Sequence, residues 1–276
     1  MEVNPDQVRL EARETLLDAV DAMGPHSDAV ILVGAQAIYV HTAPVDASFA
    51  LSPFTYDADI VLDPELLGSS PAIVDAMSRA GFQLGDQPGR YRRDVGPQVD
   101  LLVPEAVGGP GRRAARLGVH GNRAAMKVHG LEGALVSHTR MTISSLVPGA
   151  GRACILKVAR PAALLVAKVH KVGERLRDSD VRRRDPVAKD AFDMYRLLRA
   201  VDTPDLAAEF RLLRAHGVSS RVTFEALALF RDLFSSPSGT GTGLVGEYVR
   251  GLEDTDFVVE SSVALSRDLL EATSRH

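Results

Sequence analysis

Apolar residues are spaced in two different ways along this chain, and the change falls near residue 160. Before that point, short apolar or alternating runs bounded by glycine and proline predict strands, and a few amphipathic stretches predict helices. The expected strands are residues 29–33, 55–62, 82–84, 90–94, 98–103, 125–128 and 154–159. The expected helices are residues 6–23, 35–41 and 71–80, with loops over 42–53 and 108–118.

After residue 160, apolar positions recur at helical spacing almost to the end of the chain. The expected helices are residues 161–177, 186–200, 204–216, 223–234, 244–252 and 257–273, with a flexible connector over 235–243. The pattern therefore predicts an α+β fold with two domains. The N-terminal domain, residues 1–160, holds a mixed sheet flanked by helices, and the C-terminal domain, residues 161–276, is all-helical.

Composition narrows the class of protein. With 45% hydrophobic and 25% charged residues, the 276-residue chain is an ordinary globular protein. Its single cysteine, Cys154, excludes a disulfide framework and a multi-cysteine metal site, and it favours a reducing compartment. The longest apolar run, 29–40, is too short for a membrane helix, and acidic residues stand where a secretory signal has basic ones. We therefore expect a cytoplasmic protein with no membrane partner.

The net charge of −4 conceals a basic segment in the middle of the chain. Residues 152–199 carry 13 basic and 6 acidic side chains, a net charge of +7, whereas the segments on either side are acidic. Three consecutive arginines, Arg182, Arg183 and Arg184, lie within it. This surplus indicates an anion-binding surface, although a solvated, salt-bridged helix face has the same composition.

Two aspartates share one face of an expected strand. In TYDADIVL, residues 55–62, the period of two in a strand puts Asp57 and Asp59 on one face and Ala58 and Ile60 on the other. Carboxylates this close repel one another and lose hydration, so they persist most readily when a divalent cation neutralises them. Mg²⁺ suits the pair, because it takes one or two carboxylates and completes its shell with water and phosphate oxygens.

Further residues support this interpretation, since an Asp-x-Asp pair also occurs on solvent-facing strands. Asp100, in QVDLLVP, is placed to add a third carboxylate from a neighbouring strand, as a two-metal site requires. Upstream, an expected strand ends at Gly34 and a helix follows, an arrangement in which backbone N–H groups hold phosphate. Gly34 also fits a plain turn. Together these features favour metal-assisted phosphoryl chemistry.

Basic residues on the first C-terminal helix form a stripe. Lys168, Lys171 and Arg175 are spaced to share one face, which could meet phosphates. On the next helix Lys189 and Asp193 are four residues apart, a spacing that also fits an intrahelical ion pair. Given the acidic strand, we expect Lys168 to bind phosphate and Lys189 and Asp193 to shape the nucleotide or acceptor side.

In this order, these residues resemble the motifs of the nucleotidyltransferase superfamily that includes DNA polymerase β and the aminoglycoside nucleotidyltransferases. The first half carries Val33-Gly34-Ala35, then Thr55-x-Asp57-x-Asp59, then Asp100. The second half carries PAALLVAKVHK from Pro161 to Lys171, then Arg184-Asp185, then Lys189-Asp190-x-x-Asp193. The second set resembles the AbiEii/MenT nucleotidyltransferase toxins of bacterial toxin–antitoxin and phage-defence systems, and the resemblance runs from about residue 30 to 198.

The resemblance implies an enzyme that moves NMP from an NTP to an acceptor hydroxyl and releases pyrophosphate. Two Mg²⁺ ions would be held by Asp57, Asp59 and Asp100. The implied catalytic residues are these three aspartates and Lys189, and the implied nucleotide-binding residues are Gly34, Ala35, Thr55, Lys168 and Asp193. The implied acceptor is RNA, such as the 3′ end of tRNA, and the implied partner is an antitoxin that restrains a growth-inhibiting toxin.

Two departures from the family pattern leave alternatives open. The chain has Gly34-Ala35 where such families usually have Gly-Gly or Gly-Ser, and Pro53 where they commonly have arginine. These differences motivate a non-catalytic module with the same fold that binds nucleotide, RNA or a protein. Within the enzyme class, a small acceptor of the aminoglycoside type is a further alternative.

Overall fold

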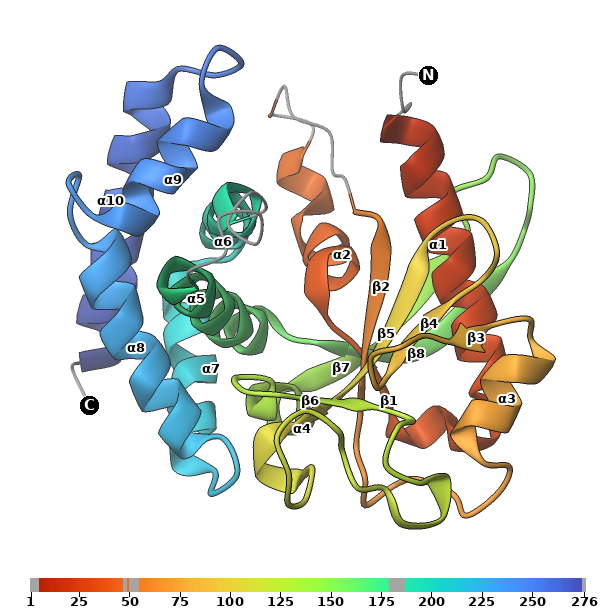
Figure 1. The fold of residues 1–276 in the computed structure, drawn as a ribbon. Coiled ribbons are helices and arrows are strands. Elements are labelled where there is room, and N and C mark those ends of the chain that lie inside the picture. The colour runs from red at the N-terminus through yellow and green to blue at the C-terminus, as the bar shows by residue number, and fades with distance from the viewer. Residues whose placement is uncertain (1–4, 47–48, 50–54, 179–186, 275–276) are drawn as a thin grey trace. The chain divides into compact units, whose positions relative to one another are not determined.

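The structure is a computed structural model that describes residues 5–46, 49, 55–178 and 187–274. Its contacts divide the chain into two compact units (Figure 1). The sheet unit comprises Met1–Ala37 and Pro53–Ala159, and the helical unit comprises Ile38–Ser52 and Arg160–His276. The predicted α+β class, with an N-terminal mixed sheet flanked by helices and a helical C-terminal region, is confirmed.

The sheet unit is built on an eight-stranded sheet in the order β3-β4-β5-β2-β1-β8-β7, with β6 paired to β5. The strands are β1 (Val30–Leu32), β2 (Asp57–Leu62), β3 (Gln83–Leu84), β4 (Arg90–Arg92), β5 (Gln98–Pro104), β6 (Met126–Val128), β7 (His138–Ser144) and β8 (Ala153–Ala159). The pairs β2–β5, β1–β8 and β5–β6 are parallel and the others are antiparallel. β1, β2 and β5 are buried along most of their length, which explains their continuous apolar sequences.

Helices cover this sheet. They are α1 (Pro5–Ala22), α3 (Ile73–Arg79), α4 (Glu132–Val136) and the first turn of α2 (Gly34–Asp46), with 3₁₀ turns η1 (Gly24–Ala29), η2 (Glu105–Val107) and η3 (Gly118–His120). α1 packs against β2, β5 and β8, because its apolar positions Ala12, Leu16 and Ala19 fall on one buried face. From Ile38 onward, the residues of α2 belong to the helical unit.

The helical unit consists of the rest of α2 together with the helices that follow the sheet. These are α5 (Pro161–Arg177), α6 (Val187–Ala200), α7 (Thr203–Ala215), α8 (Ser220–Phe234), α9 (Thr240–Val249) and α10 (Thr255–Ser274). α6 packs against α5 and α9, and α10 packs against α7, α8 and α9. Aromatic side chains, among them Phe192, Phe210 and Phe230, fill the centre of this unit.

A buried arginine joins α2 and its following segment to this core. Arg196 on α6 is only 2% exposed. Its guanidinium carbon lies 5.5, 5.6 and 5.0 Å from the ring centroids of Tyr39, Phe49 and Phe192. Cation–π contacts of this kind stabilise a guanidinium that burial would otherwise disfavour. Tyr39 is therefore part of the packing of the helical unit, although it lies far before that unit in the sequence.

Two local predictions from the sequence are wrong, and one strand was not predicted. The expected loop at 42–53 begins too early, because α2 continues through Pro44 to Asp46 with Thr42 fully buried. The expected connector at 235–243 ends in helix, because α9 begins at Thr240, and a Cβ on Gly241 would lie 2.6 Å from the Phe234 ring. Strand β7 was not predicted, and seven residue pairs with β8 define it.

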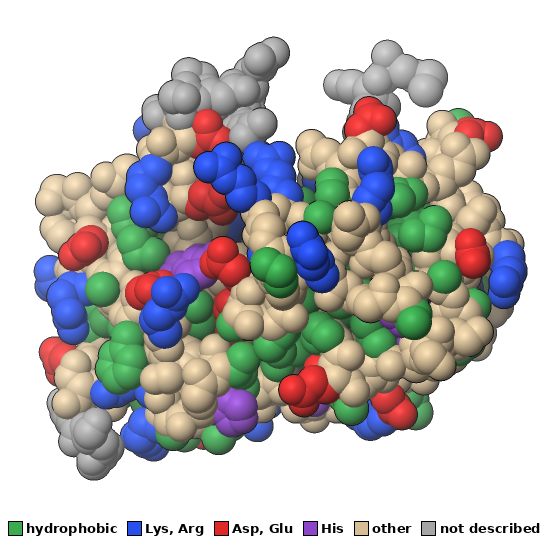
Figure 2. All heavy atoms as spheres, turned by 60° about the horizontal axis from the view of Figure 1, so that its bottom comes forward, with side chains coloured by type: hydrophobic (Ala, Val, Ile, Leu, Met, Phe, Trp, Pro, Cys, Tyr) green, Lys and Arg blue, Asp and Glu red, His purple; other side chains and the backbone are tan. Residues whose placement is uncertain are grey.

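Charge on the surface is mixed in sign. Figure 2 shows basic, acidic and apolar side chains interspersed on one face of the molecule. Arg182, Arg183, Arg184 and Pro53, which were singled out in the sequence, lie outside the described residues. Among the helices that are described, none has both the length and the apolar composition needed to cross a bilayer.

Candidate functional site

Strands β2 and β5 bring the three predicted aspartates together. They are parallel neighbours in which Asp59 pairs with Asp100 and Asp57 pairs with Gln98. One carboxylate oxygen from each of Asp57, Asp59 and Asp100 lies within 4.8 Å of the others. Asp100 is only 6% exposed, and Asp57 and Asp59 are half-buried. Three acids are thus concentrated where water screens them poorly, an arrangement that favours binding of a cation.

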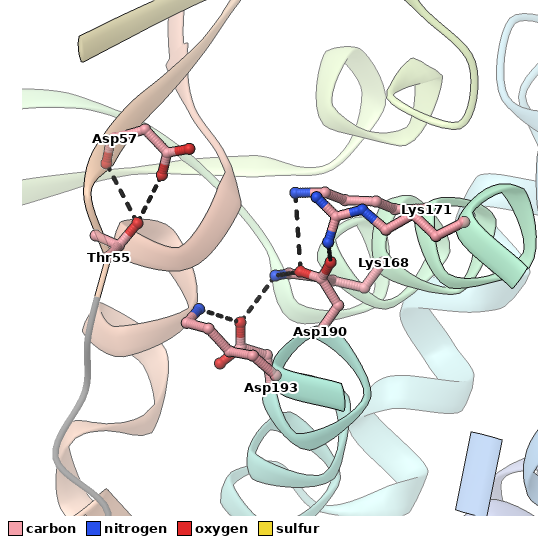
Figure 3. A network of polar contacts seen from close by, with 8 residues as sticks. Thr55, Asp57, Lys168, Lys171, Asp190 and Asp193 are labelled. Atoms are coloured by element: carbon pink, nitrogen blue, oxygen red, sulfur yellow. Dashed lines mark hydrogen bonds and ion pairs between the residues drawn. The ribbon is translucent and has the colours of Figure 1, made fainter. Parts of the chain in front are cut away.

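Hydrogen bonds fix Asp57 from two sides. Thr55 Oγ1 donates to Asp57 Oδ1 at 2.6 Å, as Figure 3 shows. Gln36 Nε2 on α2 donates to the Asp57 carbonyl oxygen at 3.3 Å and to Ala12 O at 2.9 Å. Arg13 Nε in turn donates to Gln36 Oε1 at 3.0 Å, and both side chains are buried. The motif threonine therefore orients the carboxylate, while Gln36 and Arg13, which the sequence analysis did not identify, anchor its backbone.

Gly34 makes the position of Asp59 possible. Its φ is +67°, in the left-handed region that favours glycine. A Cβ at this residue would lie 2.0 Å from Asp59 Oδ2, closer than any real contact. The Asp59 carboxylate therefore rests directly against the first residue of α2. The predicted glycine turn is confirmed, and its lack of a side chain also leaves the space that the acid occupies.

Replacing Gly34 with alanine should disturb both the turn and the acid. We expect Gly34→Ala to lose more stability than the roughly 1–2 kcal/mol of a left-handed alanine, because Asp59 must also move. The matched control is Gly151→Ala, since Gly151 has a φ of +60° and nothing within 4 Å of its Cβ position. Urea denaturation of both variants measures the difference, and equal losses would mean that the Asp59 contact carries no energetic weight.

A basic residue that was not predicted completes the cluster. Arg90 on β4 pairs in register with Asp100, on the side of β5 opposite to Asp59. Its Nε and Nη2 donate to Asp100 Oδ1 and Oδ2 at 3.0 and 3.1 Å. These hydrogen bonds, with the charges of Asp57 and Asp59, raise the pKa of Arg90 although burial lowers it. Sequence alone could have suggested it only through the pairing of β4 with β5.

The donor set fits a hard divalent cation. All three acids offer oxygen, which Mg²⁺ and Mn²⁺ prefer, and they come from a rigid pair of adjacent strands. The three carboxylates and the Arg90 guanidinium sum to a formal charge of −2. The residues present therefore fit a divalent ion in both charge and chemistry.

A second polar network lies within the helical unit, where α5 faces α6 (Figure 3). Lys168 Nζ lies 2.5 Å from Asp190 Oδ1 and 2.8 Å from Asp193 Oδ2. Arg175 also pairs with Asp190, whose Oδ1 lies 3.8 Å from Lys171 Nζ. On α6 itself, Lys189 Nζ lies 3.0 Å from Asp193 Oδ2. We call these six residues the α5–α6 ion network.

Burial and charge act in opposite directions in this network. Burial would lower the pKa of Lys168, but Asp190 and Asp193 hold it well above its ordinary value. Burial would likewise raise the pKa of Asp190, but Lys168, Lys171 and Arg175 hold it well below its ordinary value. The network contains four cationic groups and two carboxylates, so it retains a surplus of positive charge.

The predicted site residues therefore fall into two groups. Gly34, Thr55 and the three aspartates lie together in the sheet unit, and Ala35 is buried in the first turn of α2. Lys168, Lys189 and Asp193 lie together in the helical unit. The stripe of Lys168, Lys171 and Arg175 does share one face, but that face meets Asp190. Sequence spacing could not show that acids from the next helix would occupy it.

No protein-family model and no curated protein matches the chain. Among solved structures, one match is a crystal structure of an antigenic nucleotidyltransferase-like protein from Paracoccidioides brasiliensis. The sequence identity is 12% and the TM-score is 0.38, over 91% of this chain and 93% of that chain.

Proposed function

We propose that the protein is a metal-dependent nucleotidyltransferase that transfers NMP from an NTP to an acceptor hydroxyl. The observation that carries this proposal is the triad on β2 and β5, where three carboxylate oxygens converge within 4.8 Å beside the glycine that starts α2. Pairs of divalent ions held by acids in this way promote in-line displacement at phosphorus. Thr55 orients Asp57 and Arg90 orients Asp100, which supports this assignment.

Each residue has a distinct part in the proposal. Asp57 and Asp59 bind the divalent ions, which when present neutralise phosphate charge and favour ionisation of the acceptor hydroxyl. Asp100 would bind the second ion and help to deprotonate the acceptor hydroxyl. Gly34 and the start of α2 offer backbone N–H groups to a phosphate.

The α5–α6 ion network is the second binding element in the proposal. Its surplus of positive charge favours an anion such as a triphosphate. Lys168 is the phosphate ligand that the sequence suggests. Lys189 and Asp193 would shape the nucleotide or acceptor side of the site. Lys168 is 5% exposed, however, whereas the side chain of Lys171 is 43% exposed, so a phosphate arriving from solvent meets Lys171 first.

A labelling assay tests the proposal directly. The protein is incubated with each radiolabelled NTP, Mg²⁺ and total RNA, and transfer of label is followed together with release of pyrophosphate. The same assay with EDTA tests dependence on the metal. Metal-dependent binding of NTP without any transfer, to RNA or to small hydroxylated acceptors, would instead favour the non-catalytic module.

RNA is the acceptor class that we propose. The segment 152–199 carries a net charge of +7, which attracts a polyanion and repels a cationic aminoglycoside. The resemblance to the AbiEii/MenT enzymes further suggests the 3′ end of tRNA as acceptor, the role of a growth-inhibiting toxin, and an antitoxin as partner. Arrest of growth on expression of the chain, relieved by a neighbouring gene product, tests that role.

RNA labelling should depend strongly on salt. A polyanion that displaces counterions loses affinity steeply, so we expect labelling at limiting RNA to fall at least about tenfold between 50 and 200 mM salt. Binding of the NTP alone, measured in parallel, should change much less. Labelling that is indifferent to salt would point to a small acceptor or a protein acceptor.

A further inference from the structure

We propose that Arg90 is an internal counter-ion that keeps Asp100 closed to cations until nucleotide binds, so that the nucleotide-free protein holds one divalent ion rather than two. The inference rests on the metal site proposed above. Arg90 lies outside the sequence motifs, and its role here is to position Asp100.

Three charged side chains form a row across three strands. Asp59 on β2 is in register with Asp100 on β5, and Asp100 is in register with Arg90 on β4. Arg90 binds both carboxylate oxygens of Asp100 through two parallel hydrogen bonds, at 3.0 and 3.1 Å. Bidentate pairs of this kind are the stronger and more directional form of the arginine–carboxylate contact. Both oxygens of Asp100 therefore accept a hydrogen bond from Arg90, and the guanidinium charge opposes a cation at either of them.

The backbone beneath Arg90 is held in place. Gly89, with a φ of +74°, is packed so closely that a Cβ would lie 2.3 Å from Leu101 O and 2.5 Å from Met126 N. Its carbonyl oxygen accepts a hydrogen bond from Leu101 N at 2.7 Å, and its N–H donates to Arg123 O at 2.9 Å. Because this backbone is fixed, release of Asp100 requires movement of the Arg90 side chain, which is 28% exposed.

Charge decides how many ions the site accepts. Asp57, Asp59, Asp100 and Arg90 sum to −2, so one divalent ion neutralises the cluster. A second ion would have to displace Arg90 and would leave the site positive. An NTP carries the negative charge that offsets this excess. Arg90 thereby couples occupation of Asp100 to the arrival of the substrate.

The test counts ions on the protein without nucleotide. Mn²⁺ is titrated into wild type, Arg90→Gln and Arg92→Gln, and free Mn²⁺ is measured by electron paramagnetic resonance. Arg92→Gln is the matched control, because Arg92 lies on the same strand, is exposed and pairs in register with Gln83 of β3. We expect wild type and Arg92→Gln to bind one ion each. Arg90→Gln should bind a second ion, at least about tenfold more tightly than any second ion on wild type.

Further variants separate the possible outcomes. Arg90→Lys retains the charge without the bidentate contact and should be intermediate, and Asp100→Asn combined with Arg90→Gln should lose the second ion again. Two ions on wild type, or one ion on both wild type and Arg90→Gln, overturns the inference and leaves the proposed function standing. An absence of Mn²⁺ binding in all variants, each shown to be folded by circular dichroism, removes the proposed function itself.

Discussion

Replacing Asp59 with asparagine should abolish transfer while leaving the protein at least as stable as wild type. Asp59 is central to the triad, since it follows Asp57 on β2 and lies opposite Asp100 on β5. Loss of one metal ligand removes several kcal/mol of transition-state stabilisation, so we expect activity to fall at least about a thousandfold. Asparagine keeps the shape of the side chain and removes one of three repelling charges, so the metal-free protein should not be weakened.

The control for Asp59→Asn is a substitution of a second aspartate in the same part of the chain. Asp63 directly follows β2, and its carboxylate accepts a hydrogen bond from Glu65 N at 3.0 Å, away from the triad. Asp63→Asn should retain activity within a few fold. Transfer by initial rates and melting temperature in EDTA are measured for both variants. Wild-type activity in Asp59→Asn would remove this carboxylate from the mechanism.

Replacing Asp190 with asparagine should strongly destabilise the helical unit. Asp190 is 3% exposed and contacts Lys168, Lys171 and Arg175. The network already has more cations than acids, so removing an acid leaves buried positive charge with less compensation. Breaking a buried ion pair in this way costs about 3–5 kcal/mol. Lys171→Gln is the control, because the Lys171 side chain is 43% exposed, and pairs at such sites contribute about 0–1 kcal/mol.

The contribution of Asp190 to the free energy of unfolding should decrease as the pH falls. Its pKa is lowered in the folded protein, so its contribution is complete above the unfolded value of about 3.9 and is lost as the pH falls through the folded value. Urea denaturation should therefore show a constant difference between wild type and Asp190→Asn above about pH 5, and a smaller difference below about pH 4. A variant within about 1 kcal/mol of wild type at neutral pH would show that the network is not essential to the fold.

The triad could be predicted from the sequence because strand geometry alone fixes much of it. Alternation puts Asp57 and Asp59 on one face of their strand. Asp100 lies in an apolar run that is expected to form a buried strand of the same sheet. The glycine turn at Gly34 follows from the same local rules. These features depend on residues close in sequence, where periodicity is informative.

The residues around these motifs could not be predicted, because their partners come from distant segments. Arg90 is recognisable only once β4 is paired with β5. Gln36 reaches Asp57 because α2 begins just after β1, which pairs with β2. The sequence suggests Lys168 through its place in a basic stripe. The spacing of the stripe does not show that Asp190 and Asp193 contact Lys168, because packing between the two helices sets how α5 meets α6.

The course of α2 limits how the protein can be divided. Its first residues belong to the sheet unit, whereas Ile38 and the residues after it, including Tyr39, belong to the helical unit. A truncated chain that starts at residue 161 would therefore lack the Tyr39 and Phe49 rings that pack on Arg196. Gene fragments cut at that point would yield incomplete modules, so exchange of one unit between related proteins would have to transfer two separate stretches of coding sequence together.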